Sequence, residues 1–582
     1  KEIHLYIPPK GYIPPKTTGK HKTTPCYLDV RNGFLHIGGD DSQKYRPGMR
    51  KIYYCSDFED KGRPDLKTFQ RCPHCERRLG ARQLSGFSTR GNFSFFSLIQ
   101  AQFEAQPPVP DKVGNLELPN EGRKVLLFSD SRQGAAKLAR DMSDASDSMA
   151  ARQLFALAMQ RMAQEQEPHT LNEIYGYFAL EAAQHNVRMF SGTDRLIFWN
   201  ECEKAARRAK KRRELDLEIE SAPPQMQVQF LRQFCGGYNT ITDTAMAWIE
   251  PERRSFKYAL DDLEDSGITV PPQLFLELFN AWMLDVCRDS MALGHRIGSE
   301  VREELLLPFH GCGLPENWEF SRTIQGIMGW KKNDPVMKKW RNVLEDHFLD
   351  CGVMGQNRKY INLKRVRIGF DLEHAWFRCT RCSELTAFPF REKCPNCGSP
   401  SLHPLEAKEL EAMELWRRQM KAALEGKSIR IIDTEEHTAQ LSYKDQRDAM
   451  WSRTEEYELR FQDIFEEGDA PVDILSSTTT MEVGIDIGSL VAVGLRNIPP
   501  LRENYQQRAG RAGRRGAALS TIVTFCENGP HDTLYFHDPS PMFRGDPRRP
   551  WLDTLSPRLL HRHLAMVSLQ CYFEQNGLGG LD

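Results

Sequence analysis

Residues 472–488 of the chain read VDILSSTTTMEVGIDIG. The first seven residues form a largely apolar run of strand length, and small, hydroxyl-bearing and glycine residues follow it. In a parallel α/β sheet, such a segment lies at the carboxyl end of a strand, where these folds bind their ligands. Small residues there let backbone amides approach a phosphate closely, and Asp486 can accept a hydrogen bond from a ribose hydroxyl. The stretch therefore predicts one wall of a nucleotide site.

A second motif, QQRAGRAGRRG, follows at residues 506–516. It places Arg508, Arg511 and Arg514 three residues apart, which brings them to one face of a helix. A guanidinium fits phosphate oxygens, and an arginine delivered to a γ-phosphate from a neighbouring lobe is the arginine-finger arrangement. Alone, either motif could be a solvated Arg-rich helix or a glycine turn. Their occurrence about 20 residues apart, each after a predicted strand, favours the phosphate site.

The sheet is predicted from two distant parts of the chain. KVLLFSDSRQGAAKLARDM at residues 124–142 has the pattern of a strand, a turn and a helix. Strand-like runs return as IRIID (429–433), VDILSST (472–478), LVAVGLRNI (490–498) and STIVTFC (520–526). Residues 148–350 show mainly helical periodicity. We therefore expect an α/β lobe with a parallel sheet, split by a large helical insertion and accompanied by zinc-ribbon modules.

These patterns divide the chain into segments with distinct expected structures. The predicted segments are an extended linker (1–25), a small β-rich zinc module (26–110), the first part of the α/β lobe (111–145), a helical insertion (146–365), a zinc ribbon (366–405), the remainder of the lobe (406–535) and a C-terminal extension (536–582).

Composition sets the broad class. The 582 residues are 40% apolar with a formal net charge of −1, which is typical of a globular protein with several domains. Basic residues gather at 204–213, 358–367 and 502–515, and the first of these runs fits a solvated helix face as well as a binding surface. The sequence has neither an apolar run of the roughly 18–20 residues that a membrane span needs nor a signal peptide. We expect a cytoplasmic protein without a membrane partner.

Two groups of cysteines have the spacing of metal ligands. Cys379, Cys382, Cys394 and Cys397 form two C-x-x-C pairs, the spacing of a four-thiolate zinc ribbon. Four thiolates leave no open position, so a structural Zn²⁺ is predicted. A second site is predicted from Cys26, Cys55, Cys72 and Cys75, with His36 and His74 as alternative ligands. The alternative for this group is a hairpin with Cys26 simply buried.

The two opening motifs resemble motifs V and VI of superfamily 2 helicases of the DExH type, and residues 124–140 resemble motif IV. The stretch EEHTAQLSYKDQR and the following FEEGDAPVDILSS resemble the segment that precedes motif V. The wording FSDSRQ, EHTAQ and SSTTTMEVGIDIG is similar to Mrf-type repair helicases and to the large helicase subunits of phage-defence systems such as Druantia and DISARM. This resemblance implies a RecA-like second motor lobe.

The resemblance also implies roles for individual residues. Arg511 and Arg514 match the pair that reaches the ATP phosphates, and Gln507 matches the residue near the γ-phosphate. Gly484, Asp486 and Arg508 match positions that bind the nucleotide. Thr478, Ser129 and Arg132 match positions on the nucleic-acid backbone. Contacts along one backbone imply binding that is independent of base sequence and sensitive to salt. The resemblance favours DNA, although the motifs do not distinguish it from RNA.

The other half of an ATP site is missing from the sequence. No G-x-x-x-x-G-K-[ST] occurs, and no DExH box follows a strand. We therefore expect ATP and Mg²⁺ to be held largely by a first RecA-like lobe, supplied by a longer form of this protein or by a partner subunit, and the chain to be part of a defence complex. The alternative is a non-catalytic, helicase-like scaffold that binds nucleic acid or a partner.

Overall fold

The structure is a computed structural model, which describes most of the chain. The described residues are 2–8, 23–31, 34–37, 48–55, 59–60, 63–69, 72–73, 93–115, 117–165, 167–236, 240–305, 312–353, 357–437, 453–465, 470–482, 487–488, 490–513, 519–527, 529–544 and 556–577. The chain divides into two compact units. Unit 1 comprises residues 1–88, 108–122 and 140–434, and unit 2 comprises residues 89–107, 123–139 and 435–582.

Unit 2 is built on a five-stranded sheet with the strand order β15-β16-β7-β17-β18. The strands are β15 (Thr434–His437), β16 (Ile474–Ser477), β7 (Val125–Phe128), β17 (Ala492–Leu495) and β18 (Thr521–Thr524). The pairings of β16 with β7, β7 with β17 and β17 with β18 are parallel. The α/β class predicted from the sequence is therefore confirmed.

Strand β7 lies at the centre of this sheet, although its partners follow it by more than half of the chain. Val125 pairs with Ile474 on one side, and Leu126 pairs with Val493 on the other. All four residues of β7 are fully buried, as a central strand covered on both faces requires. The prediction that one sheet is assembled from two distant segments is thus confirmed.

Helix α1 (Phe93–Glu104) packs against β17 and β18 in unit 2. Gln102 donates its side-chain amide to the carbonyl of Thr521 at 2.9 Å. The helix also lies close to Gly494 of β17, where a Cβ would be only 2.5 Å from Ile99. A residue larger than glycine would therefore clash with the helix at this position. The helix therefore belongs to the sheet unit, whereas the predicted boundaries group its residues with the N-terminal module. In its described residues, unit 2 also contains the helices α14 (Arg453–Phe461), α15 (Arg502–Ala509), α16 (Pro530–His537), α17 (Ser540–Phe543) and α18 (Pro557–Gln575).

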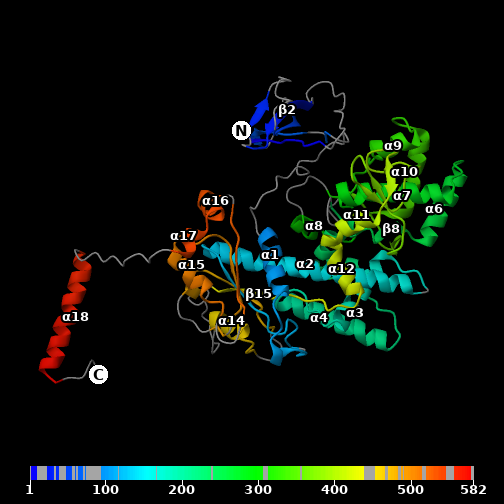
Figure 1. Cartoon of the computed structure of the whole chain (residues 1–582). Helices are drawn as coiled ribbons and strands as arrows, with labels where there is room; N and C mark the ends of the chain where they lie inside the picture. The colour runs from blue at the N-terminus through cyan, green and yellow to red at the C-terminus, as the bar shows by residue number, and fades with distance from the viewer. Residues whose placement is uncertain are drawn as a thin grey trace. The chain divides into compact units, whose positions relative to one another are not determined.

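The insertion in unit 1 is mainly helical, as its sequence predicts (Figure 1). Helix α2 (Arg132–Gln164) belongs to unit 2 up to Ala139 and to unit 1 from Arg140 onward. The following helices are α3 (Ile174–Gln184), α4 (Gly192–Lys210), α5 (Pro224–Phe234), α6 (Arg253–Asp265), α7 (Pro272–Asp285), α8 (Ser299–Leu305), α9 (Arg322–Met328) and α10 (Pro335–Phe348). Their apolar faces form one continuous core, which includes the fully buried Phe155, Phe178 and Trp282.

Short strands occur within and after the helical insertion. Strand β8 (Ala247–Pro251) pairs with β11 (Val366–Phe370), and β9 (Leu349–Cys351) pairs with β10 (Lys359–Ile361). Each of these pairings is antiparallel. The ribbon strands are β12 (Phe377–Cys379), β13 (Leu385–Thr386) and β14 (Leu402–Pro404), and the helices α11 (Ala407–Ala412) and α12 (Glu414–Leu424) follow.

The predicted strand IRIID is wrong. Residues 429–433 have no strand structure, and Ile429 is buried in the helical core of unit 1. The carbonyl of Ile431 accepts a hydrogen bond from the Asn120 side chain, and the amide of Ile432 donates to the hydroxyl of Ser146. Ile429 and the half-buried Ile431 therefore pack against the helical core, and the edge strand β15 begins only at Thr434.

The N-terminal residues of unit 1 form two small sheets. One is antiparallel and contains β2 (Thr23–Asp29), β3 (Leu35–Ile37) and β4 (Met49–Cys55). The other contains β1 (Glu2–Ile3), β5 (Glu59–Asp60) and β6 (Arg63–Lys67). Short strands were expected in this region. None of the helices in the described ranges is long and apolar enough to span a lipid bilayer.

Candidate functional site

The carboxyl edge of the unit 2 sheet brings together the ends of strands that are far apart in sequence. Ser129 follows β7, Thr478 follows β16 and Arg496 follows β17. The amide of Ser129 donates to the carbonyl of Ser477 at 2.9 Å, so the ends of β7 and β16 are hydrogen-bonded neighbours. Ser129 and Thr478 are each 6% exposed. The structure therefore places two of the three predicted backbone-binding residues on adjacent strand ends.

The turn after β7 is shaped by close contacts. A Cβ on Gly134 would lie 2.5 Å from the hydroxyl oxygen of Ser129 and 2.7 Å from that of Ser131. The amide of Gly134 donates to the Ser131 hydroxyl at 3.0 Å. Arg132, the third predicted backbone contact, is exposed at the first residue of α2. Gly134, near the start of α2, thus lets the helix approach the strand end, with Arg132 open to solvent.

Arg508 of α15 holds three parts of the edge together. Its Nε donates to Glu482 at 2.7 Å, and its Nη1 donates to Asp130 at 2.9 Å. The guanidinium also lies 5.4 Å from the ring centre of Phe128 in β7. Arg508 is only 2% exposed. Because both carboxylates belong to the same lobe, the guanidinium is engaged within the protein.

Glu482 ends the short 3₁₀ turn Thr479–Glu482, which follows Thr478. It accepts a second hydrogen bond, from the Asn504 side chain at 3.0 Å. The segments that resemble motifs V and VI are therefore joined by the hydrogen bonds that Asn504 and Arg508 donate to Glu482. These partners could not be predicted from the sequence, because nothing in the spacing of Asp130, Glu482 and Arg508 indicates which of them meet.

The remaining motif residues differ in exposure. Gln507 is exposed on α15, and Arg511, in the turn after the helix, is 4% exposed. The amide of Arg511 donates to the carbonyl of Arg508, and the amide of Gly513 donates to Leu490. The turn is thus fastened to the residues just before β17. Gly484, Asp486 and Arg514 lie outside the described residues.

A buried histidine adds to this edge. His437, at the end of β15, is 4% exposed. Its Nε2 lies 2.6 Å from a carboxylate oxygen of Glu458 in α14, and its Nδ1 lies 3.4 Å from the hydroxyl of Thr480. The EEHTAQ segment therefore contacts the turn after β16 through His437. Its residues beyond His437 lie outside the described ranges.

The four cysteines of the predicted ribbon converge in unit 1. The Sγ atoms of Cys379, Cys382, Cys394 and Cys397 all lie within 4.8 Å of one another. Hydrogen bonds from the other three thiols lower the pKa of the Cys379 thiol. Four thiolates at this separation fit the tetrahedral site of Zn²⁺. Among the described residues, this is the only such group of His, Cys, Asp or Glu side chains.

Both cysteine pairs sit on tight turns of the same kind. The residue after the second cysteine has a left-handed backbone in each turn, with φ of 61° at Ser383 and 70° at Gly398. The amides of Ser383 and Gly398 each donate to the carbonyl of the first cysteine of their pair, at 2.8 Å. These turns direct the two sulfur atoms of each pair to the same point. The local geometry therefore supports the predicted structural role.

A hydrogen-bonded chain connects the ribbon to the helical insertion. Asn396 donates to the sulfur of Cys382 at 3.7 Å and to a carboxylate oxygen of Glu384 at 2.6 Å. Glu384 is buried and also accepts two hydrogen bonds from Arg288, in the π-helical segment after α7. Such outer contacts orient metal ligands and are part of a metal site. The ribbon is therefore anchored to the insertion close to its ligands.

Two of the cysteines predicted for the second metal site, Cys26 and Cys55, do not converge. In the antiparallel pairing of β2 with β4, Cys55 is opposite Thr23, whereas Cys26 is opposite Ile52. Side chains alternate between the faces of a strand, so Cys26 and Cys55 point to opposite faces of this sheet. Cys26 packs in an apolar cluster with Ile52 and Tyr54, and burial raises the pKa of its thiol to about 11. Cys26 is therefore a buried thiol. Cys72 lies outside the strands, and Cys75 and His74 lie outside the described residues.

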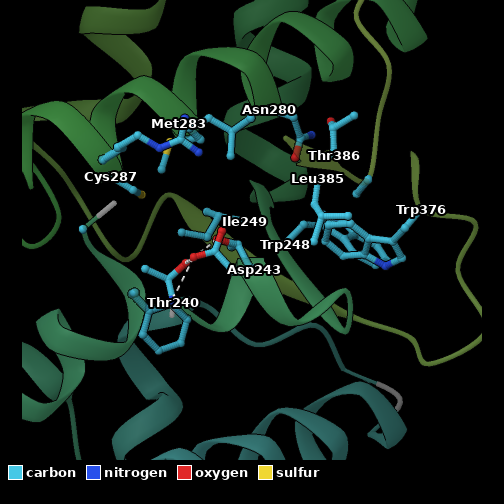
Figure 2. Close-up of a pocket in the computed structure, with 16 residues that line it drawn as sticks. Thr240, Asp243, Trp248, Ile249, Asn280, Met283, Cys287, Trp376, Leu385 and Thr386 are labelled. Carbon is cyan, nitrogen blue, oxygen red and sulfur yellow. Dashed lines mark hydrogen bonds between the residues drawn. The ribbon is translucent and has the colours of Figure 1, made fainter. Parts of the chain in front are cut away.

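A pocket in unit 1 is lined by residues of the insertion and of the ribbon (Figure 2). Trp248 and Ile249 come from β8, whereas Trp376 and Leu385 come from the ribbon. Asp243 accepts hydrogen bonds from the amide and hydroxyl of Thr240, and burial raises the pKa of its carboxyl. The lining is largely apolar and aromatic. It also includes Arg288, the residue that pairs with Glu384. The pocket thus marks where the two parts of unit 1 meet.

The parallel sheet and the motifs at its carboxyl edge define the class of protein. Residues 434–516 match the family model of the helicase conserved C-terminal domain. The prediction of a superfamily 2 helicase C-terminal lobe is confirmed, and the chain carries this lobe.

One relative matches most of the chain. The chain is 32% identical over 584 residues to the Druantia protein DruE of Escherichia coli (strain UMEA 4076-1). This match covers 95% of the chain and 31% of DruE, so the chain spans about a third of the length of that relative. A solved structure, the DUF1998 helicase MrfA bound to DNA and AMPPNP, matches 26% of this chain and 19% of its own, with 20% identity and a TM-score of 0.19.

Proposed function

We propose that this chain is the second motor lobe of an ATP-dependent superfamily 2 DNA helicase or translocase. The observation that carries the proposal is the shared edge of the sheet. Motif VI on α15, the turn after β16 and the turn after β7 all lie at the carboxyl ends of the parallel strands, where Arg508 bridges them. This edge is where nucleotide-binding α/β folds place their ligands.

Within this lobe, Arg511, Arg514 and Gln507 would face the ATP phosphates, and Gly484 and Asp486 would contact the nucleotide. Thr478, Ser129 and Arg132 would contact the nucleic-acid backbone. For Arg508, the two carboxylate partners favour a positioning role over the predicted nucleotide contact. The Mg²⁺ ion and the phosphate cradle would come from a first RecA-like lobe, in the same longer polypeptide or in a partner subunit.

The four ribbon cysteines would hold a Zn²⁺ ion with a structural role, since no ligand position is left for a substrate. We further propose that the motor acts in an anti-phage defence system. The 32% identity to a Druantia protein over 95% of the chain supports this context.

The test is hydrolysis of ATP by the complete protein, measured with and without added DNA. The proposal predicts hydrolysis that DNA stimulates. A protein that binds DNA but hydrolyses no ATP, with no P-loop or DExH box in its own gene or in that of a partner, would establish the scaffold alternative.

A further inference from the structure

The strongest feature that the motor lobe leaves unexplained is a group of cations at the end of α4, in the helical insertion. Residues 203–213 contain seven Lys and Arg side chains and a single acid, Glu203. The chain as a whole has 78 basic and 79 acidic residues, so this local excess is not a general property of the protein. We call the exposed cations of this group the basic stripe. They are Lys204, Arg207, Lys210, Lys211, Arg212 and Arg213.

The helix is fixed from its other side. Phe198, Cys202 and Ala205 of α4 are fully buried in the core of unit 1. These positions follow the 3.6-residue period, so Lys204, Arg207 and Lys211 lie together on the solvent face. They extend over about 10 Å of the helix axis. The stripe is thus presented by a rigid, packed element.

The cations of the stripe lack an ion-pair partner among the described residues. Across the described ranges, none of these six side chains forms a hydrogen bond or an ion pair with another residue. The seventh cation, Arg208, has partners. Its Nη2 lies 3.5 Å from a carboxylate oxygen of Asp216, and its Nε donates to the carbonyl of Glu214. Like charges three and four residues apart on a helix destabilise it. The helix dipole offsets this repulsion only in the last turn.

Arg212 gives an independent observation. It has a left-handed backbone, with φ of 50°, directly after α4. The amide of Arg212 donates to Ala209 and that of Arg213 to Arg208, which is the hydrogen-bond pattern of a Schellman cap. Glycine is the favoured residue at this position of the cap, since it avoids the strain of a Cβ. The chain therefore carries a cation where a glycine would make the fold more stable.

We propose that the basic stripe binds the phosphate backbone of nucleic acid, at a site in unit 1 in addition to the motor lobe. Residues 203–213 contain no aromatic or large apolar side chain, and the exposed apolar residues of α4, Leu196 and Ile197, lie about two turns before the stripe. Regularly spaced, unpaired cations on a helix face fit a repeating polyanion that is recognised independently of its bases. This inference rests on the proposed nucleic-acid substrate, and it adds a contact that the helicase motifs do not supply.

The test compares two triple charge reversals in the complete protein without ATP. One is Lys204→Glu, Arg207→Glu and Lys211→Glu in the stripe. The matched control is Arg253→Glu, Arg254→Glu and Lys257→Glu, three exposed cations of α6. Binding of a labelled single strand and a labelled duplex, both of mixed sequence, is measured by fluorescence anisotropy over about 50 to 200 mM salt. Comparison of the two probes shows which form of nucleic acid the stripe prefers.

The stripe variant is expected to bind at least about tenfold more weakly, with a salt slope reduced by about two to three. The control should bind like the wild type. Equal affinities and slopes for the two variants would overturn the proposal, and an acidic protein partner would then be the better explanation of the stripe. Failure of the motor proposal would give a different result. DNA would then not stimulate ATP hydrolysis by the complete protein, whereas the stripe variant would still bind nucleic acid more weakly than the control.

A single substitution, Arg212→Gly, separates binding from folding. Glycine suits the left-handed position, so the melting temperature should stay the same or rise. The loss of one phosphate contact should weaken binding several-fold and lower the salt slope by about one. Unchanged binding by a variant that is at least as stable as the wild type would contradict the proposal.

Discussion

The guanidinium Nη1 of Arg508 lies 2.9 Å from a carboxylate oxygen of Asp130, a residue 378 positions earlier in the chain. The whole helical insertion and the ribbon lie between them in sequence. Arg508 also pairs with Glu482 at 2.7 Å, so one buried side chain joins the turn after β7, the turn after β16 and α15. The Arg508 guanidinium, which binds only carboxylates of its own lobe in these two ion pairs, thus holds the carboxyl edge of the sheet together.

Replacing Arg508 with alanine should therefore destabilise unit 2. Glu482, whose side chain is 7% exposed, would lose its cation, and a buried charge without a partner is costly. We expect the free energy of unfolding to fall by about 3 kcal/mol. Urea denaturation followed by circular dichroism measures this change.

Gln507→Ala is the matched control, because Gln507 is the exposed neighbour on the same helix. Exposed substitutions of this kind usually change stability by about 0.5 kcal/mol or less. If Arg508→Ala unfolds at the same urea concentration as this control, the Asp130–Arg508–Glu482 bridge does not stabilise the lobe.

Cys394→Ser should remove a zinc ion from the purified protein. Cys394 is buried within the four-sulfur group, and a serine oxygen does not replace a thiolate in such a site. Metal analysis should find one Zn²⁺ fewer per chain than in the wild type. Cys351→Ser, at an exposed cysteine outside the group, should leave the zinc content unchanged. Equal zinc in both variants would rule out the ribbon as a metal site.

Glu384→Gln tests the contacts around the ribbon. Glu384 holds Asn396, which in turn donates to the sulfur of Cys382, and it also holds Arg288 of the insertion. Loss of a partner in this outer layer typically lowers metal affinity about tenfold or more. Competition with a chelator measures the affinity for zinc. A wild-type affinity would mean that Glu384 serves only to join the ribbon to the insertion.

Asp147 should make stability depend on pH. Burial raises the pKa of this carboxyl from 3.8 to about 7, and the side chain accepts a hydrogen bond from the amide of Phe190. Between these two values, the folded protein keeps a proton that the unfolded chain releases. The stabilising contribution is therefore complete below about pH 4 and is lost as the pH rises to about 7.

Asp147→Asn cannot lose a proton, so its stability relative to the wild type should increase across this window. The increase is at most about 1.4 kcal/mol per pH unit. Urea denaturation at a series of pH values between about 4 and 8 measures it. The same series with Glu303→Gln, at an exposed glutamate, is the control. Parallel pH profiles for wild type and Asp147→Asn would show that Asp147 does not titrate in this range.

The sheet could be predicted from sequence because each of its strands has a local pattern. Residues 125–128, 474–477, 492–495 and 521–524 are apolar runs between turns, and all four are strands in the structure. The run at 429–433 has the same pattern and is not a strand, because Ile429 and Ile431 pack against the helical core of unit 1. An apolar run predicts burial, but it does not indicate which core will bury it. Strand β8 escaped prediction since its partner, β11, is more than a hundred residues away.

Some residues of the candidate sites could also be predicted from local sequence patterns, whereas others could not. The ribbon cysteines could be identified because their spacing alone builds the two turns that bring the sulfur atoms together. Cys26 and Cys55 could not be separated by sequence, because the pairing of β2 with β4 decides which face each one occupies. The carboxylates that bind Arg508 were missed for the same reason, as they meet only through the order of strands in the sheet.

The most direct test of the motor assignment is the rate of ATP hydrolysis by the complete protein carrying Arg511→Ala. The control is Arg558→Ala, at an exposed arginine of α18. DNA binding by anisotropy and the melting temperature are followed in parallel, so that a folding defect is recognised. Removal of an arginine that stabilises the transferred phosphoryl group should slow hydrolysis about a thousandfold or more, with DNA binding largely kept. Hydrolysis at the wild-type rate in Arg511→Ala would contradict the account.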